Sequence, residues 1–315
     1  MLKKIKCLSL LTVLSLGVVG CNSTTNTLKE DDKLKITLVL DEGGVNDQSF
    51  NESAWTGALA AKEKYNVEVS YIESKQESEY LQNVETAIDD SDLVIGVGYK
   101  FTDAIKEVSE AYTEQKFVLI DGSWEDMPDN VTSIMFSEED AGYSVGLVAS
   151  QMTNTNKLGF IGGFDIPSVT NFKIGFEKAL KEVDPDIKLT TQYANSFTDA
   201  AKGRVMAEQM VNNGVDIIFT AGGSVNSGVF EVMTEKNLMA IGVDMASNYI
   251  APQTIITSAL KNVNVGVETI IGELVNNSLE GGVIKEFNLK NNGVGFEKTN
   301  LLSDEIIKYV ENRIR

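Results

Sequence analysis

The sequence contains no histidine, so it lacks the commonest general base, the usual partner of a nucleophilic serine and the commonest metal ligand. It also has no Gly-x-Ser-x-Gly nucleophile elbow, no phosphate-binding loop ending in Gly-Lys-Ser or Gly-Lys-Thr, and no Gly-x-Gly-x-x-Gly dinucleotide fingerprint. Cysteine is scarce, with only Cys7 and Cys21 in 315 residues. These absences exclude a conventional catalytic triad and remove the usual signs of nucleotide binding.

Positive charge is also in short supply. With 27 basic and 46 acidic residues the net charge is −19, which argues against nucleic-acid binding and against adhesion to anionic lipid through a basic face. Acidic residues gather at 89–90, 138–140 and 184–186, but none of these clusters has the spacing of a calcium loop, and we expect solvated helix ends there. Catalysis by carboxylates alone remains open.

The first residues have the three parts of a bacterial lipoprotein signal. Lysines within residues 3–6 precede an uncharged run that is too short to span about 30 Å of hydrocarbon, and Val-Val-Gly leads into Cys21. We therefore expect residues 1–20 to be a cleaved signal peptide, Cys21 to carry lipid, and residues 21–34 to form a flexible tether. An ordinary secretory peptide with an incidental cysteine is the alternative.

Cleavage before Cys21 would change both the charge and the cysteine content. It would remove Cys7 and three lysines, so the net charge would fall from −19 to −22 and no disulfide would be possible within the chain. No second hydrophobic stretch reaches transmembrane length. The sequence therefore predicts an extracytoplasmic protein that lipid anchors to the cell membrane.

Short β-branched runs alternate with amphipathic stretches of helical length, a pattern typical of an α/β fold. The first half predicts helices near 49–65, 78–90 and 101–114, and strands at 36–40, 68–72, 93–97, 117–120 and 132–136. The second half predicts helices near 168–183, 198–213 and 225–236, and strands at 158–161, 187–193, 217–220 and 239–243. The repeated order predicts two similar lobes, each a doubly wound parallel sheet.

No low-complexity linker divides the two halves, so we expect several crossover strands to join the lobes. A late strand at 254–260 and a helix at 263–278 are expected to return to the first lobe. The first lobe would then comprise residues 35–136 and 259–284, and the second would comprise 137–258 and 285–315.

Loops that follow the carboxyl ends of strands hold the candidate site residues, because doubly wound sheets bind ligands there. The loop after the first strand offers Asn46, Asp47, Phe50 and Asn51. Asp47 has two interpretations, a cap for the helix that follows or a ligand group, while the Phe50 ring offers a stacking face. Loops after later strands add Gly98, Tyr99, Asp121, Gly222, Gly223 and Asp244.

The glycines of these loops are expected to form strand-to-helix turns. The other members are carboxylates, amides and aromatic rings. Such groups suit a neutral ligand with hydroxyls and a flat ring, because carboxylates accept hydrogen bonds from hydroxyls and rings stack on rings.

Six stretches, taken in order and spacing, resemble the basic membrane lipoprotein family of the purine nucleoside receptor type. The resemblance covers essentially the whole chain after the predicted cleavage site. The stretches are 46–51 (NDQSFN), 97–99 (VGY), 136–143 (FSEEDAGY), 159–163 (GFIGG), 221–223 (AGG) and 240–244 (AIGVD).

This resemblance implies a type I periplasmic-binding-protein fold and a substrate-binding lipoprotein of an ABC importer. Such a protein needs no catalytic residue, cofactor or metal. It would hold a nucleoside, with purines favoured, between its lobes and deliver it to permease subunits, and we expect it to be a monomer.

The resemblance also implies roles for individual residues. Phe50 would stack on the base, and Asn46 and Asp47 would contact the edge of the base. Asp244 and Lys261 would bind the hydroxyls of the ribose.

Phe197 is the candidate for a second stacking ring, and the alternative is that it packs beneath its own helix. Three other functions fit the same residues. A receptor for a sugar or a signalling molecule would use Asp244 for neighbouring hydroxyls, and a nucleoside hydrolase would use Asp47 and Asp244 as an acid pair. A surface adhesin would bind through its exterior.

Overall fold

The structure is a computed structural model that describes residues 33–314. The predicted signal peptide, the predicted lipid site at Cys21 and the predicted tether up to residue 32 lie outside the described residues. Residues 34–315 form one compact unit with its own hydrophobic cores. Within the described part of the chain, no helix is long and apolar enough to cross a membrane.

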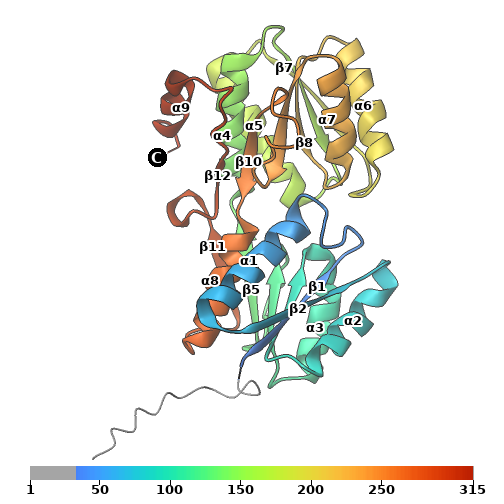
Figure 1. The fold of residues 1–315 in the computed structure, drawn as a ribbon, viewed down its shortest axis with the longest axis vertical. Coiled ribbons are helices and arrows are strands. Elements are labelled where there is room, and N and C mark those ends of the chain that lie inside the picture. The colour runs from blue at the N-terminus through green and yellow to red at the C-terminus, as the bar shows by residue number, and fades with distance from the viewer. Residues whose placement is uncertain (1–32, 315) are drawn as a thin grey trace, which may run out of the picture. The chain divides into compact units, whose positions relative to one another are not determined.

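The described residues form two six-stranded sheets (Figure 1). All strands of the first sheet are parallel. In order across the sheet they are β11 (Val283–Phe287), β5 (Val131–Phe136), β4 (Lys116–Ile120), β3 (Leu93–Val97), β1 (Lys35–Leu40) and β2 (Glu68–Glu73).

The second sheet repeats this strand order, except that its edge strand β12 runs antiparallel to β10. In order across the sheet the strands are β12 (Val294–Phe296), β10 (Ile255–Lys261), β9 (Met239–Asp244), β8 (Ile217–Ala221), β6 (Lys157–Gly162) and β7 (Lys188–Tyr193). Each sheet, with the helices that pack on it, makes one lobe, so the predicted pair of parallel-sheet lobes is confirmed.

Helices cover both faces of each sheet. On the first sheet, one face holds α1 (Phe50–Tyr65) and α8 (Val263–Val275), and the other holds α2 (Tyr80–Ile88) and α3 (Thr102–Ala111). On the second sheet, one face holds α4 (Glu138–Met152) and α5 (Pro167–Val183), and the other holds α6 (Ala200–Asn212) and α7 (Val225–Glu235). The C-terminal α9 (Asp304–Glu311) packs against α4, and the short 3-10 helices are η2 (Glu77–Glu79), η3 (Tyr99–Phe101) and η4 (Leu289–Asn291).

The alternation of side chains along the strands explains these layers. In β1, Ile36, Leu38 and Leu40 belong to the core beneath α1 and α8, whereas Val39 belongs to the core beneath α2 and α3. All four side chains are fully buried. A strand that is apolar on both faces requires cover on both sides, which is why these sheets carry two helical layers.

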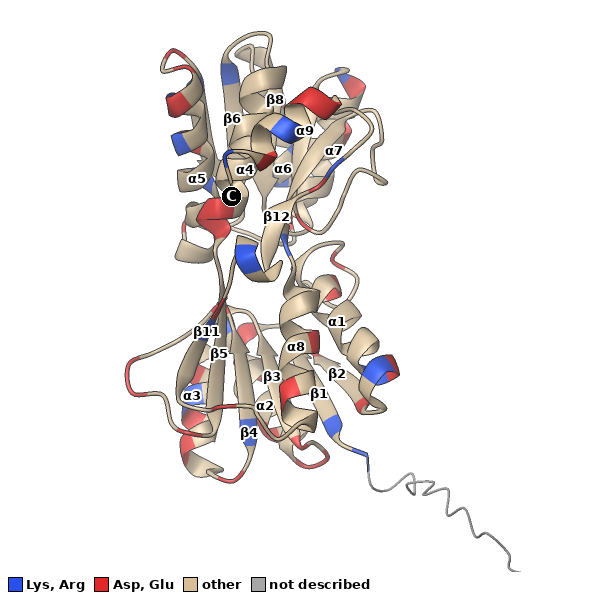
Figure 2. Ribbon diagram, turned by 90° about the vertical axis from the view of Figure 1, so that its left-hand side faces the viewer, with Lys and Arg blue, Asp and Glu red and all other residues tan. Residues whose placement is uncertain are grey.

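Three links join the lobes within residues 33–314, at Ser137, at Asn262 and at 288–293 (Figure 2). The prediction that the late strand returns to the first lobe is wrong, because β10 pairs with β9 and β12 in the second sheet. The helix after it, α8, does pack on the first lobe, beside α1. The link therefore lies at Asn262 and not near residue 259, and β11 keeps residues 285–287 in the first sheet.

Candidate ligand-binding site

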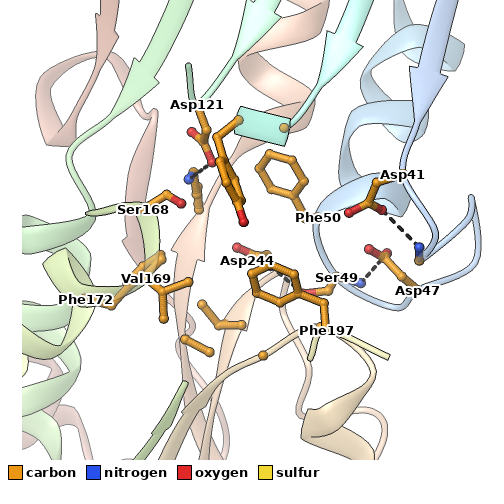
Figure 3. Close-up of a pocket in the computed structure, with 18 residues that line it drawn as sticks. Asp41, Asp47, Ser49, Phe50, Asp121, Ser168, Val169, Phe172, Phe197 and Asp244 are labelled. Carbon is orange, nitrogen blue, oxygen red and sulfur yellow. Dashed lines mark hydrogen bonds and ion pairs between the residues drawn. The ribbon is translucent and has the colours of Figure 1, made fainter. Parts of the chain in front are cut away.

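A cavity lies between the lobes, at the carboxyl ends of the strands of both sheets (Figure 3). Its volume is about 90 Å³, smaller than the range of about 300–1,000 Å³ that small-molecule sites commonly occupy. The lining residues are Asp41, Gly43, Asp47, Ser49, Phe50, Gly98, Tyr99, Asp121, Ser168, Val169, Phe172, Phe197, Ala221, Gly222, Gly223, Val243, Asp244 and Lys261.

Most residues that the sequence nominated line this cavity, and two do not. Asn46 is exposed and lines a separate small pocket with Ser224 and Ser247. Asn51 is buried in the first turn of α1, where its Nδ2 donates to Asp41 Oδ1 at 2.7 Å. The structure therefore places Asn51 behind the cavity wall. The nominated residues that line the cavity are Asp47, Phe50, Gly98, Tyr99, Asp121, Phe197, Gly222, Gly223, Asp244 and Lys261.

Sequence reasoning missed one wall of the cavity, the start of α5. The neighbouring residues Ser168 and Val169 line the cavity there, together with Phe172 one helical turn further along α5. The sequence carries the same indication for these residues as for Phe50. Helix α5 follows the carboxyl end of β6, just as α1 follows the carboxyl end of β1.

Asp47 does act as a cap for α1. Its Oδ1 accepts hydrogen bonds from the backbone N–H of Ser49 at 2.9 Å and of Glu52 at 3.1 Å, and its Oδ2 accepts one from the N–H of Asn51 at 2.9 Å. Burial raises the pKa of Asp47 to about 6, although these three hydrogen bonds oppose the rise. The hydrogen bonds show the capping role. The same carboxyl group also lines the cavity, where its contact with a ligand is a proposal.

Aromatic rings from both lobes meet at the cavity. Phe50, from the start of α1 in the first lobe, has Gly98 beside its ring, and Gly98 has a φ of 112° that disfavours any side chain there. Phe197, from the loop before α6 in the second lobe, makes an edge contact with Phe164 at 5.0 Å between ring centroids. The Lys100 ammonium of the first lobe lies 5.8 Å from the centre of the Phe197 ring. Phe197 is therefore half-buried at the cavity, and its ring is not beneath α6.

Lys261 is the cation that lines the cavity, and it is almost fully buried. Its Nζ donates to Asp121 of the first lobe and, at 2.8 Å, to Glu138 Oε1 of the second. Burial would lower the pKa of Lys261, but the negative charges of Asp121, Glu138 and Asp244 raise it above its ordinary value. The expectation that the 138–140 cluster is solvated is wrong for Glu138, whose burial is made possible by this ion pair.

Asp121 and Asp244 occupy equivalent places, at the carboxyl ends of β4 and β9 in the two lobes. Both have left-handed backbone conformations, with φ of 61° and 62°, an uncommon geometry for residues other than glycine that clusters at functional sites. Asp244 accepts a hydrogen bond from the hydroxyl of Ser49, across the lobes. Burial raises the pKa of Asp121 to about 7 and also raises that of Asp244.

One carboxyl oxygen in the cavity has no partner. Asp121 Oδ1 is buried and forms no hydrogen bond with any described residue, while Oδ2 of the same group accepts from Lys261. A buried acceptor without a donor costs free energy of about 1–3 kcal/mol. A ligand hydroxyl in the cavity would supply the missing donor.

Comparison with known proteins identifies the family. The sequence profile described as "ABC transporter substrate-binding protein PnrA-like", abbreviated Bmp, matches residues 34–314. The chain belongs to this family. It is 33% identical to the "ABC transporter nucleoside-binding protein BmpA" of Lactococcus lactis, over 96% of this chain and 94% of that protein. It is 35% identical to "Basic membrane protein A" of Borreliella afzelii, over 88% of this chain and 87% of that protein.

Solved structures share the fold. A solute-binding protein of an ABC transporter system from Aeropyrum pernix matches with a TM-score of 0.80 and 29% identity, over 89% of this chain and 79% of that one. A LacI-family transcriptional regulator from Enterococcus faecium, solved with bound ribose, matches with a TM-score of 0.64 at 18% identity, over 85% of this chain and 100% of that one. The predicted type I periplasmic-binding-protein fold is thereby confirmed. As a member of the Bmp family, the protein is an extracytoplasmic substrate-binding protein of an ABC transporter and not an enzyme.

Proposed function

We propose that this protein captures nucleosides, purine nucleosides above all, in the cavity between its lobes and delivers them to a membrane permease. The observation that carries the proposal is the pairing of aromatic rings from both lobes with a buried carboxyl oxygen that lacks a donor. A base supplies the flat surface that the rings of Phe50 and Phe197 stack on, and a ribose supplies hydroxyls to Asp121 and Asp244. The nucleoside-binding relative from Lactococcus lactis supports the same ligand class.

Capture couples to closure of the lobes. A ligand that contacts residues of both lobes stabilises the closed arrangement by its difference in affinity for the closed and open states. Phe50 and Asp121 contribute from the first lobe, and Asp244 and Lys261 contribute from the second. The permease would then recognise the closed form.

A lipid on Cys21 would hold the protein at the membrane. The tether of residues 21–34 then keeps the folded unit near the permease, which raises its effective concentration there. Replacing Cys21 with Ala should release the protein from the membrane without changing its affinity for ligand.

Calorimetric titration tests the proposal directly. The chain from residue 22 onward contains the whole compact unit, and it is unfolded and refolded to remove any carried-over ligand before titration with adenosine, guanosine, inosine, cytidine, uridine and ribose. We expect tight binding of purine nucleosides, and losses of at least tenfold, or about 1.4 kcal/mol, in Phe50→Ala and in Asp244→Ala. If none of these compounds binds, nucleoside binding is ruled out. Binding of ribose alone would favour a sugar receptor.

A further inference from the structure

Glu138 is a buried charged residue beside the cavity that does not line it. Its side chain is 2% exposed, at the first position of α4 and directly after the link at Ser137. Its Oε1 accepts from Lys261 Nζ at 2.8 Å, and its Oε2 accepts from Asn171 Nδ2 of α5 at 3.3 Å. Both oxygens therefore have a partner inside the second lobe.

The two carboxylates that hold Lys261 differ in their place in the fold. Asp121 belongs to the first lobe, so its ion pair with Lys261 crosses the cleft and must break when the lobes separate. Glu138 and Lys261 both belong to the second lobe, so their ion pair persists in the open protein. A buried ammonium needs a partner in either state, and Glu138 supplies one that does not depend on closure.

The Glu138–Lys261 pair also joins two of the three links between the lobes. Glu138 follows the link at Ser137, and Lys261 precedes the link at Asn262. Between them the ammonium lies 5.2 Å from the ring centres of Phe50 and Phe136. This arrangement leaves the ammonium one defined position at the base of the cavity.

We infer that Glu138 is a positioning residue, which holds the Lys261 ammonium in its ligand-binding place while the lobes are open. Asn171 supports Glu138 from the other side. The inference rests on the proposed function only in taking Lys261 as a ligand contact. It gives a role to the 136–143 stretch, which the resemblance singled out and the cavity lining does not use.

The test compares Glu138→Gln with Glu139→Gln, a matched control one residue along α4. Glu139 is half exposed and pairs with Lys178 at the surface. In calorimetric titration with the tightest-binding nucleoside we expect Glu138→Gln to weaken binding at least tenfold and Glu139→Gln to leave it unchanged. Asn171→Ala, a milder change that keeps every charge, is expected to weaken binding about threefold.

A measurement without ligand separates this inference from the proposed function. The Lys261 ammonium can be titrated by NMR in the ligand-free protein, where burial lowers its pKa and the charges of Asp121, Glu138 and Asp244 raise it. Glu138 lies in the same lobe as Lys261, so its contribution does not depend on closure. Removing the Glu138 charge removes one raising cause, so the midpoint should move to lower pH in Glu138→Gln and stay in place in Glu139→Gln. A role in helix packing alone would not move it.

The outcomes are distinct. Weaker binding together with a lowered midpoint supports the positioning role. Unchanged affinity in Glu138→Gln, with wild-type binding intact, overturns it and leaves nucleoside capture standing. If the wild type binds no nucleoside, the proposed function fails, and the midpoint alone decides: a shift supports the positioning of Lys261, and no shift overturns it.

Discussion

At the scale of single residues, the backbone of one lobe sets where the Phe197 ring lies. A Cβ atom placed on Gly163 would come within 2.3 Å of two carbons of that ring. The ring therefore packs directly on bare backbone at the end of β6, and glycine at position 163 is what permits it. Phe164 closes the other side through its edge contact with the same ring.

Gly163→Ala should displace the Phe197 ring from the cavity. We expect purine nucleosides to bind about tenfold more weakly, equivalent to about 1.4 kcal/mol, with a cost in stability of about 1–3 kcal/mol from overpacking. Calorimetric titration and thermal unfolding measure the two effects. Gly295→Ala is the control, because nothing lies within 4 Å of its added Cβ, and it should change neither quantity. Wild-type affinity in Gly163→Ala would mean that Phe197 does not contact the ligand.

The sequence predicts the place of a single residue only where that place depends on nearby residues in the chain. Asp121 and Asp244 could be nominated because each follows a buried strand, and the carboxyl ends of parallel strands share one edge of the sheet. The burial of Glu138 could not be predicted, since its partner Lys261 lies 123 residues away in the sequence. An acidic residue at a helix start is ordinarily solvated, and only the assembled cavity shows otherwise.

At the scale of elements, the first turn of α1 places several of the groups that line the cavity. The Asp47 cap fixes the first turn of α1, and that turn carries both Phe50 and Ser49, whose hydroxyl reaches Asp244. The cap at the start of α9 has a similar local role, with Ser303 Oγ accepting from the N–H of Ile306 at 3.3 Å. Helix α9 does not line the cavity.

Removal of these two caps should separate stability from binding. Asp47→Ala and Ser303→Ala should each lower the free energy of unfolding by about 0.5–2 kcal/mol, because each strips a cap from a helix start. We expect only Asp47→Ala to weaken nucleoside binding as well, since fraying of α1 displaces Phe50. Urea denaturation and calorimetric titration at pH 7.5 provide the check. Equal binding by both variants would show that the ligand does not depend on the first turn of α1.

The helices and strands could be predicted because the spacing of hydrophobic residues within a short segment indicates each of them. The sheet to which β10 belongs could not be predicted, because a strand buried on nearly every residue fits either sheet equally well. Its place is fixed by pairing with β9 on one side and with β12 on the other, and β12 is a three-residue strand that is too short to carry a pattern of its own. The prediction that the helix after β10 belongs to the first lobe is confirmed, because α8 packs beside α1.

At the scale of the whole molecule, the proposed function requires that the lobes open and close. Among the described residues, side chains of the two lobes meet at the cavity in three places. Lys261 contacts Asp121 and the rings of Phe50 and Phe136, Ser49 contacts Asp244, and Lys100 faces the rings of Phe164 and Phe197. The first two lie in the cavity wall and bear on the ligand directly. Lys100 does not line the cavity, so it is the member that can be changed with least effect on ligand contacts.

Replacing Lys100 should therefore affect the closure of the lobes more than the contacts with the ligand. Its ammonium is held at 2.8 Å from Glu42 Oε2 within the first lobe, and from there it faces the rings at 5.8 and 6.0 Å. An ammonium over aromatic rings contributes about 0.5–1 kcal/mol at exposed sites, so its removal should favour the open state by that amount. Because apparent affinity falls with the population of the binding-competent state, nucleosides should bind about two- to fivefold more weakly.

Lys100→Met tests this, since methionine keeps an apolar stem against the rings and removes only the charge. Small-angle scattering of the ligand-free variant should give a larger radius of gyration than the wild type, and saturating nucleoside should bring both to the same closed value. Lys75→Met is the control: Lys75 pairs with Glu73 in the same lobe and is 75% exposed, so neither the radius nor the affinity should change. A ligand-free radius identical to that of the wild type, with affinity unchanged, would show that Lys100 has no part in holding the lobes together.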